Sequence, residues 1–184
     1  MSHPHILKKD NSVLVVIDIQ TKLWEVIFEK ERVLSQVGKL IKAFKIFDIP
    51  IILTEQYPQG MGPTHPEILE LLKETEKFEK FSFSCLKKEE FIQKLFSLNK
   101  NQIVLTGIES HICVLQTAYD LLEKNFSVFI PYDAVSSRKK GDWENALERL
   151  QKDGIIIGSV ESFIFEILER ADTPVFREIL KIIK

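Results

Sequence analysis

Short apolar runs alternate with longer amphipathic segments along this chain. The apolar runs have the length of β-strands and are rich in β-branched residues; they lie at 12–19, 49–56, 101–108, 125–132 and 154–159. Between them, apolar positions recur at the three- and four-residue spacing of a helix. These helical patterns cover 32–47, 89–98, 111–124, 143–153, 163–169 and 174–184.

The strand-length runs are apolar at consecutive positions, which is typical of parallel strands covered by helices on both faces. An antiparallel α+β arrangement would require polar and apolar residues to alternate along each strand. The order of the elements therefore predicts a doubly wound, mainly parallel α/β sheet. Ligands bind beyond the carboxyl ends of the strands in such sheets, so polar residues at those ends are the candidates for function.

Several polar side chains stand at these positions, and each has a simple structural explanation as well. Asp18 ends the first run and is costly to bury unless it is paired, but it could also be a solvated helix cap. Glu55, Gln56 and Tyr57 lead from the second run into a Gly/Pro-rich loop at 58–66 that either forms a pocket wall or only connects elements. Lys80, among phenylalanines in FEKFSFSCL, is either an exposed charge or a lysine paired with a carboxylate.

Cys113 lies where the third run gives way to a helical pattern. Free N–H groups and the helix dipole at such a start favour a thiolate and can hold an oxyanion during acyl transfer. The alternative is that Cys113 only packs in the core. His111 is two residues away and does not share a helix face with it, so a simple Cys–His pair is doubtful.

Composition narrows the function classes. The 184 residues suit a single domain spanning 1–184. Lys and Arg number 25 and Asp and Glu 27, so a net charge of −2 gives no reason to expect a nucleic acid or an anionic membrane as partner. Two cysteines without a secretory signal pattern predict reduced thiols and a cytoplasmic protein.

The motifs VLVVIDIQ, LTEQYPQGMGPTHPEI, FEKFSFSC, LTGIESHICVLQTAYDL and YDAVSSR follow one another along the chain, and ALERLQKDGIIIGSVESFIFEIL comes after them. In this order they resemble the isochorismatase-like cysteine hydrolases, a nicotinamidase-related superfamily, over nearly the whole chain. The likeness is greatest to the isochorismatase-domain-containing branch. Several distinct motifs in order are far more specific than any one of them.

The resemblance implies a catalytic triad of Asp18, Lys80 and Cys113. Asp18 would take the thiol proton, Lys80 would hold that carboxylate and lower the thiol pKa, and Cys113 would form a covalent acyl-enzyme that water resolves. It also implies a cis peptide bond at Ile108–Glu109, with the backbone amides of Glu109 and Cys113 as the oxyanion hole.

The substrate-binding residues that the resemblance indicates are Leu23, Trp24, Glu55, Gln56, Tyr57 and Ile112. Relatives that use a metal carry an Asp-x-His motif after the second strand, whereas this chain has Glu55-Gln56-Tyr57. We therefore expect no metal and no cofactor. Isochorismatases proper do not need a nucleophilic cysteine, so the presence of Cys113 favours C–N or acyl hydrolysis.

The leading hypothesis is a metal-independent cysteine hydrolase acting on a small amide or a related C–N or acyl compound. A non-catalytic scaffold or interaction protein and a redox-sensing thiol protein are the alternatives. The family resemblance and the apolar tail PVFREILKII also predict a homo-oligomer, a dimer or larger. The partner that we expect for the site is a small-molecule substrate.

Overall fold

The computed structural model describes residues 3–184, so Met1 and Ser2 of the predicted domain lie outside the described residues. Its centre is one seven-stranded sheet with the order β3-β2-β1-β4-β5-β7, in which β6 pairs with β4. Every strand pair is parallel. The strands are β1 (Ser12–Ile17), β2 (Ile51–Gln56), β3 (Lys77–Lys80), β4 (Gln102–Ile108), β5 (Ser127–Pro131), β6 (Val135–Ser136) and β7 (Ile156–Gly158).

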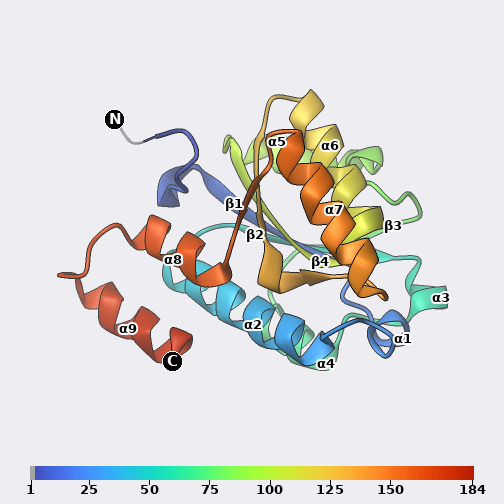
Figure 1. Cartoon of the computed structure of the whole chain (residues 1–184), viewed down its shortest axis with the longest axis horizontal. Coiled ribbons are helices and arrows are strands. Elements are labelled where there is room, and N and C mark those ends of the chain that lie inside the picture. The colour runs from blue at the N-terminus through green and yellow to red at the C-terminus, as the bar shows by residue number, and fades with distance from the viewer. Residues whose placement is uncertain (1–2) are drawn as a thin grey trace.

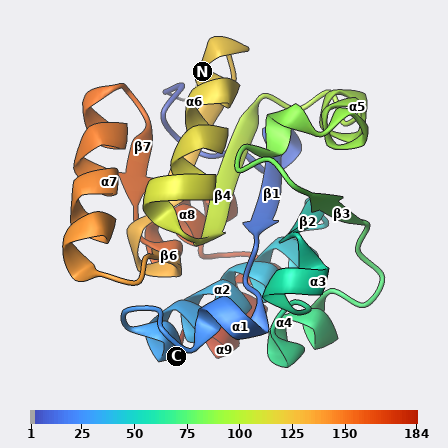
Figure 2. The same cartoon turned by 90° about the vertical axis from the view of Figure 1, so that its right-hand side faces the viewer.

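Helices cover both faces of this sheet (Figures 1 and 2). One face carries α2 (Lys30–Ile46), α8 (Val160–Leu168) and α9 (Pro174–Ile183), and the other carries α5 (Glu89–Ser97), α6 (Leu115–Glu123) and α7 (Lys140–Lys152). The short helices are α1 (Thr21–Trp24), α3 (Pro58–Met61) and α4 (Pro66–Leu71). Single helical turns η1 (Lys9–Asn11), η2 (Cys85–Lys87), η3 (Ser110–Val114) and η4 (Tyr132–Ala134) complete the elements.

Alternation along the buried strands divides the core into two layers. In β1, Leu14 and Val16 pack on the side of α2, whereas Val13, Val15 and Ile17 pack on the side of α5 and α6. Successive side chains of a strand point to opposite faces, so a strand that is covered on both sides must be apolar throughout. The predicted fold class, a mainly parallel α/β sheet with helices on both faces, is confirmed.

Two local predictions need correction. The segment at 58–66 is not simply a loop, because it contains α3 and the start of α4; Pro58 and Pro66 each occupy the first helical turn, where a missing N–H costs nothing. The helix predicted at 111–124 begins instead with η3, a π-helical turn, and becomes α-helical only at Leu115. π-Helical turns occur often at functional sites.

The apolar tail packs on its own chain. Ile179 of α9 is fully buried, and Val175, Phe176 and Ile182 pack against the same core as α2. Part of the apolar surface of the tail is therefore buried within its own chain and is not left only for a partner subunit. No helix within residues 3–184 has both the length and the apolar character needed to cross a membrane.

Candidate functional site

The candidate site lies at the carboxyl ends of four neighbouring strands. Asp18 follows β1, Gln56 ends β2, Lys80 ends β3, and Cys113 lies in η3 just after β4. The strand order reverses between β1 and β4, and crevices at such reversals are the usual ligand sites of open parallel sheets. In Figure 2 the short helices α1 and α3 lie beside this end of β1.

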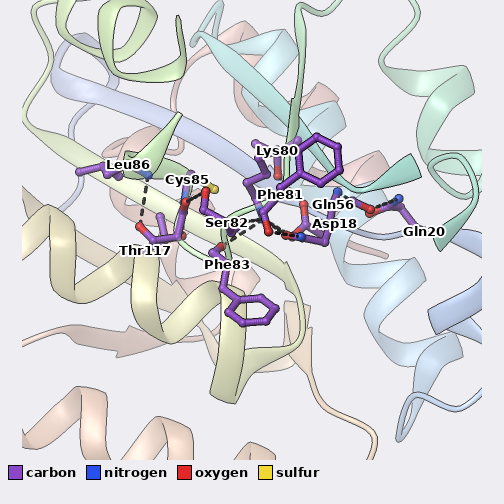
Figure 3. A network of polar contacts seen from close by, with 12 residues as sticks. Asp18, Gln20, Gln56, Lys80, Phe81, Ser82, Phe83, Cys85, Leu86 and Thr117 are labelled. Atoms are coloured by element: carbon purple, nitrogen blue, oxygen red, sulfur yellow. Dashed lines mark hydrogen bonds and ion pairs between the residues drawn. The ribbon is translucent and has the colours of Figure 1, made fainter. Parts of the chain in front are cut away.

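Asp18 and Lys80 form a buried ion pair. Lys80 Nζ lies 2.6 Å from Asp18 Oδ2, and the two residues are only 2% and 1% exposed, respectively. The hydroxyl of Thr54 donates to the other carboxylate oxygen, Oδ1, at 2.7 Å. Figure 3 shows the side chains of Asp18 and Lys80 beside each other. Both oxygens of Asp18 are thus held in place, as buried carboxylates require.

The ammonium group of Lys80 has further acceptors around it. It donates to Gln56 Oε1 at 2.9 Å and to the backbone oxygens of Phe83 and Ser82 at 3.1 and 3.3 Å. Burial by itself would lower the pKa of Lys80, but the charge of Asp18 and the nearby thiols outweigh it and raise the pKa. Lys80 is therefore a charged group at neutral pH with a fixed position.

The pKa of the Cys113 thiol is raised, not lowered. Burial is the main cause, and the negative charge of Asp18 raises the pKa further. Lys80 acts in the opposite direction but does not compensate. Lys80 thus lowers the thiol pKa, as the resemblance implies, but desolvation and the nearby carboxylate have the stronger effect, so the net shift of the pKa is upward.

This arrangement favours proton transfer within the site over release of the proton to solvent. Loss of the Cys113 proton to water would leave two anions, a thiolate and the Asp18 carboxylate, beside one ammonium. Transfer of the same proton to Asp18 leaves the net charge of Asp18, Lys80 and Cys113 at zero before and after. The geometry therefore suits a thiol that becomes nucleophilic only when a neighbouring base accepts its proton.

The turn that carries Cys113 is held close to β1. Gly107 has a φ of 119°, and a Cβ atom at this position would lie 2.0 Å from the carbonyl oxygen of Ile17. Only glycine permits this approach. The peptide bond between Ile108 and Glu109 is cis, and this is the position that the family resemblance implies. The Glu109 carboxylate accepts hydrogen bonds from the backbone N–H and Nε of Arg138, at 2.9 and 3.1 Å.

A cavity of about 330 Å³ opens onto Cys113. Of the residues selected from the sequence, Asp18, Leu23, Gln56, Tyr57, Ile108, Glu109, Ile112 and Cys113 line it. Lys80 stands behind Asp18 and does not belong to the lining. Sequence reasoning missed four lining residues, Gln20, Met61, Phe83 and Arg138.

Two predicted substrate-binding residues lie elsewhere. Trp24 is buried in the core below α2, with its ring centroid 5.2 Å from that of His65, because the inner face of α1 turns toward the core. Glu55 points away from the site, since it alternates along β2 with Thr54 and Gln56. Its carboxylate instead accepts from the N–H and hydroxyl of Thr64, both at 2.7 Å, and pairs with Lys77 at 2.9 Å.

The side chain of Gln20 connects two of the segments that surround the cavity. Its amide nitrogen donates to the carbonyl oxygens of Gln56 and Gly62 at 3.0 and 2.7 Å, and its oxygen accepts from the Gln56 N–H at 2.7 Å. One buried side chain thereby joins the end of β2 to the end of α3. Gln20 follows Asp18 by two positions, but nothing in its sequence context indicated this role.

The remaining histidine and cysteine candidates have other contacts. His111 Nδ1 lies 2.8 Å from the hydroxyl oxygen of Ser137, so the expectation that it does not pair with Cys113 agrees with its position. Cys85 and Cys113 are both free thiols. Within residues 3–184, no group of three or more His, Cys, Asp or Glu side chains is arranged to hold a metal ion.

Comparisons with known proteins place this chain in a family. Residues 12–162 match the isochorismatase domain. Isochorismatase domain-containing protein 2 of Danio rerio is 41% identical over 179 residues, which cover 96% of this chain and 89% of the relative. The secreted isochorismatase effector Isc1 of Phytophthora sojae is 37% identical over 95% of this chain and 85% of its own length.

A solved structure shows the same architecture. The MAR1 ribonuclease from Caenorhabditis elegans superposes with a TM-score of 0.92 and 37% identity, and the match covers 97% of this chain and 92% of that one. The matched region includes every strand of the sheet and the residues at the strand ends. Family and fold therefore agree with the resemblance found in the motifs. This chain belongs to the isochorismatase domain family, a family of hydrolases.

Proposed function

We propose that this protein is a metal-independent cysteine hydrolase that cleaves a small amide, or a related C–N or acyl compound, through an acyl-cysteine intermediate. The observation that carries the proposal is a single cavity lined by both the Cys113 thiol and the Asp18 carboxylate, which Lys80 holds in place. A nucleophile, a base and a group that orients the base are the parts that covalent acyl transfer requires.

In the first half of the reaction, the sulfur of Cys113 attacks the substrate carbonyl carbon while its proton passes to Asp18. The carbonyl oxygen becomes negative, and we assign the backbone amides of Glu109 and Cys113 as its hydrogen-bond donors. The C–N bond then breaks, and Asp18 returns the proton to the departing nitrogen. The products of this half are an amine and a thioester on Cys113.

In the second half, water attacks the thioester carbon and gives one proton to Asp18. The C–S bond breaks, the acid leaves, and the proton returns to the sulfur. Asp18 thus acts first as a base and then as an acid in each half of the reaction, as is usual in general acid–base catalysis. Lys80 keeps its own proton throughout; its contacts with Gln56 Oε1 and two backbone oxygens hold it in place while Asp18 is neutral.

Hydrolysis of RNA is a second candidate, because the C. elegans relative that shares 37% identity over most of both chains is named a ribonuclease. The exposed rings of Tyr57, Phe81 and Phe83 near the cavity offer surfaces on which bases could stack. Against it, Arg138 is the only cation among the residues lining the described cavity, whereas RNA-binding grooves normally present several. We therefore rank amide hydrolysis first.

The test is a screen of small amides, imides, nitriles and a single-stranded RNA, run on the wild type and on Cys113→Ala. We expect turnover of at least one C–N compound, and a fall of about 10⁴-fold in kcat for Cys113→Ala, as for loss of a catalytic nucleophile. Thermal unfolding of both proteins shows whether the variant keeps its fold.

The alternatives give different results. A scaffold protein turns over none of the compounds, and its partners bind equally to both proteins. A redox-sensing thiol reacts with peroxide at Cys113 without any turnover. Cleavage of RNA that survives in Cys113→Ala would replace the proposal with the second candidate.

A further inference from the structure

The most exposed charged side chain of the cavity lining is a cation, although the charges of the site as a whole are balanced. Two ion pairs adjoin the cavity, Asp18 with Lys80 and Glu109 with Arg138. Asp18 and Lys80 are almost fully buried, and the Glu109 side chain is 5% exposed. Only the side chain of Arg138 is open, at 54% exposure. Arg138 is therefore the most exposed charged side chain of the lining, whereas its counter-ion Glu109 is largely covered.

The guanidinium group of Arg138 is oriented and still has donors to offer. Its Nε donates to Glu109 Oε2 at 3.1 Å, and the same oxygen accepts from the Arg138 backbone N–H at 2.9 Å. Within residues 3–184, neither Nη atom of Arg138 makes a hydrogen bond to a protein atom. A guanidinium anchored through Nε presents its remaining N–H groups as a fork that fits a carboxylate.

The rest of the lining defines the body of the ligand. Leu23, Met61, Ile108, Ile112 and Phe83 give the cavity a mainly apolar wall. Its volume of about 330 Å³ suits a small molecule. Tyr57 also lines the cavity and is 47% exposed, and its ring centroid lies 5.6 Å from that of Phe81.

We propose that Arg138 is the substrate-recognition residue of this site, and that the substrate is an anionic amide: a small, mainly apolar molecule that carries a carboxylate beside its scissile C–N bond. The inference rests on the proposed function, because it names the substrate class of the same cavity. Glu109 positions Arg138 and immediately precedes the turn that carries Cys113, so this ion pair connects the group that recognises the anion to the turn of the reacting thiol.

Two alkylating reagents test this without knowledge of the substrate. Iodoacetate and iodoacetamide both transfer a two-carbon group to a thiol and release iodide, but only iodoacetate is an anion. The rate of labelling at Cys113 is measured for each by peptide mass spectrometry, and their ratio is divided by the ratio for N-acetylcysteine. We expect a corrected preference for iodoacetate of about tenfold, which corresponds to about 1.4 kcal/mol.

Variants assign the preference to Arg138. In Arg138→Met the preference falls to about one while the iodoacetamide rate changes less than about threefold, and Arg138→Lys keeps part of it as a point charge. Lys139→Met is the matched control, because it removes the neighbouring exposed cation, which does not line the cavity; it leaves the preference unchanged.

The outcomes separate the two proposals. If iodoacetamide labels Cys113 and the wild type shows no preference for iodoacetate, the anion site is wrong and the cysteine hydrolase stands. An equal loss of preference in Lys139→Met and Arg138→Met reflects a general surface field and also overturns the site. If neither reagent labels Cys113 while both label the unfolded chain, the nucleophile itself is wrong, and the inference falls with it. Should Arg138→Met not fold, the wild-type ratio and Arg138→Lys still decide.

Discussion

The two cysteines of this chain occupy similar surroundings and differ in what can reach them. Cys85 in η2 and Cys113 in η3 both influence the pKa of Lys80, and burial raises the pKa of both thiols. Cys85 is fully buried and lines none of the described cavities, whereas Cys113 is 7% exposed and faces the cavity. Of the two cysteines, only Cys113 lines the cavity together with Asp18.

The environment of Cys85 is that of a structural residue. Its backbone N–H donates to the hydroxyl oxygen of Thr117 at 3.1 Å, and burial raises the pKa of its thiol to about 11. In Figure 3, Cys85 and Thr117 lie at one end of the polar network and Gln20 at the other. Neither burial nor a raised pKa distinguishes the two thiols; a position in the cavity that Asp18 also lines does.

The largest expected effect is the contrast between the two alanine variants. Cys113→Ala loses about 10⁴-fold in kcat. Cys85→Ala keeps kcat within about threefold but loses about 1 kcal/mol of unfolding free energy, because a packed side chain is truncated. Turnover of a hydrolysed amide and chemical denaturation measure the two quantities. A comparable loss of turnover in both variants would mean that Cys85 also takes part in catalysis, which contradicts its assignment as a structural residue.

Asp18→Asn separates a base from a simple electrostatic effect. The carboxylate is the second cause of the raised Cys113 pKa, so its removal leaves Lys80 facing the thiol and lowers the pKa. Turnover nevertheless falls by about 10³-fold, since the proton acceptor is gone. Absorbance of the thiolate at 240 nm against pH, in a Cys85→Ala background, reports the pKa.

The matched control for that variant is Asp172→Asn, which removes an exposed carboxylate paired with Arg170. It leaves both the titration and the turnover unchanged. Thermal unfolding shows whether Asp18→Asn keeps its fold, because Lys80 then lacks its counter-ion. If thiolate forms at lower pH and turnover persists, Cys113 works as a free thiolate and Asp18 is not its base.

The smallest expected effect concerns the structural thiol. Thr117→Val removes the acceptor of the Cys85 N–H and leaves a buried donor unpaired, which costs about 1–2 kcal/mol of unfolding free energy. Turnover stays within about twofold, since Thr117 does not line the cavity and the side-chain partners of Asp18 are Thr54 and Lys80. A tenfold loss of turnover with normal stability would mean that the surroundings of Cys85 affect catalysis at Cys113.

The sequence contained the sheet and the residues at its strand ends because those depend on local patterns. Continuous apolar runs predict buried parallel strands, and Asp18 was conspicuous as a charge at the end of one; β3, which ends at Lys80, alternates exposed and buried residues and was not among the predicted runs. The prediction that Glu55 binds substrate could have been avoided. Side chains alternate along β2, so Glu55 points to the opposite face of the sheet from Thr54 and Gln56, which both contact the site.

The remainder depends on contacts between distant segments. Arg138 and Phe83 reach the cavity from separate segments after β6 and β3, and no local pattern predicts that convergence. Burial reversed the expected effect on Cys113, because a helix start favours a thiolate only where solvent or a cation outweighs desolvation. The amount of burial is a tertiary property that sequence spacing does not contain.

The most direct test of the account is to look for the acyl group itself. The wild type is mixed with an amide that it hydrolyses, quenched in acid within one turnover, digested and analysed by mass spectrometry. The account predicts the acyl mass on the peptide that contains Cys113 and none on the peptide that contains Cys85. Full turnover with both peptides unmodified, in a quench fast enough to trap a thioester, would contradict covalent catalysis by Cys113.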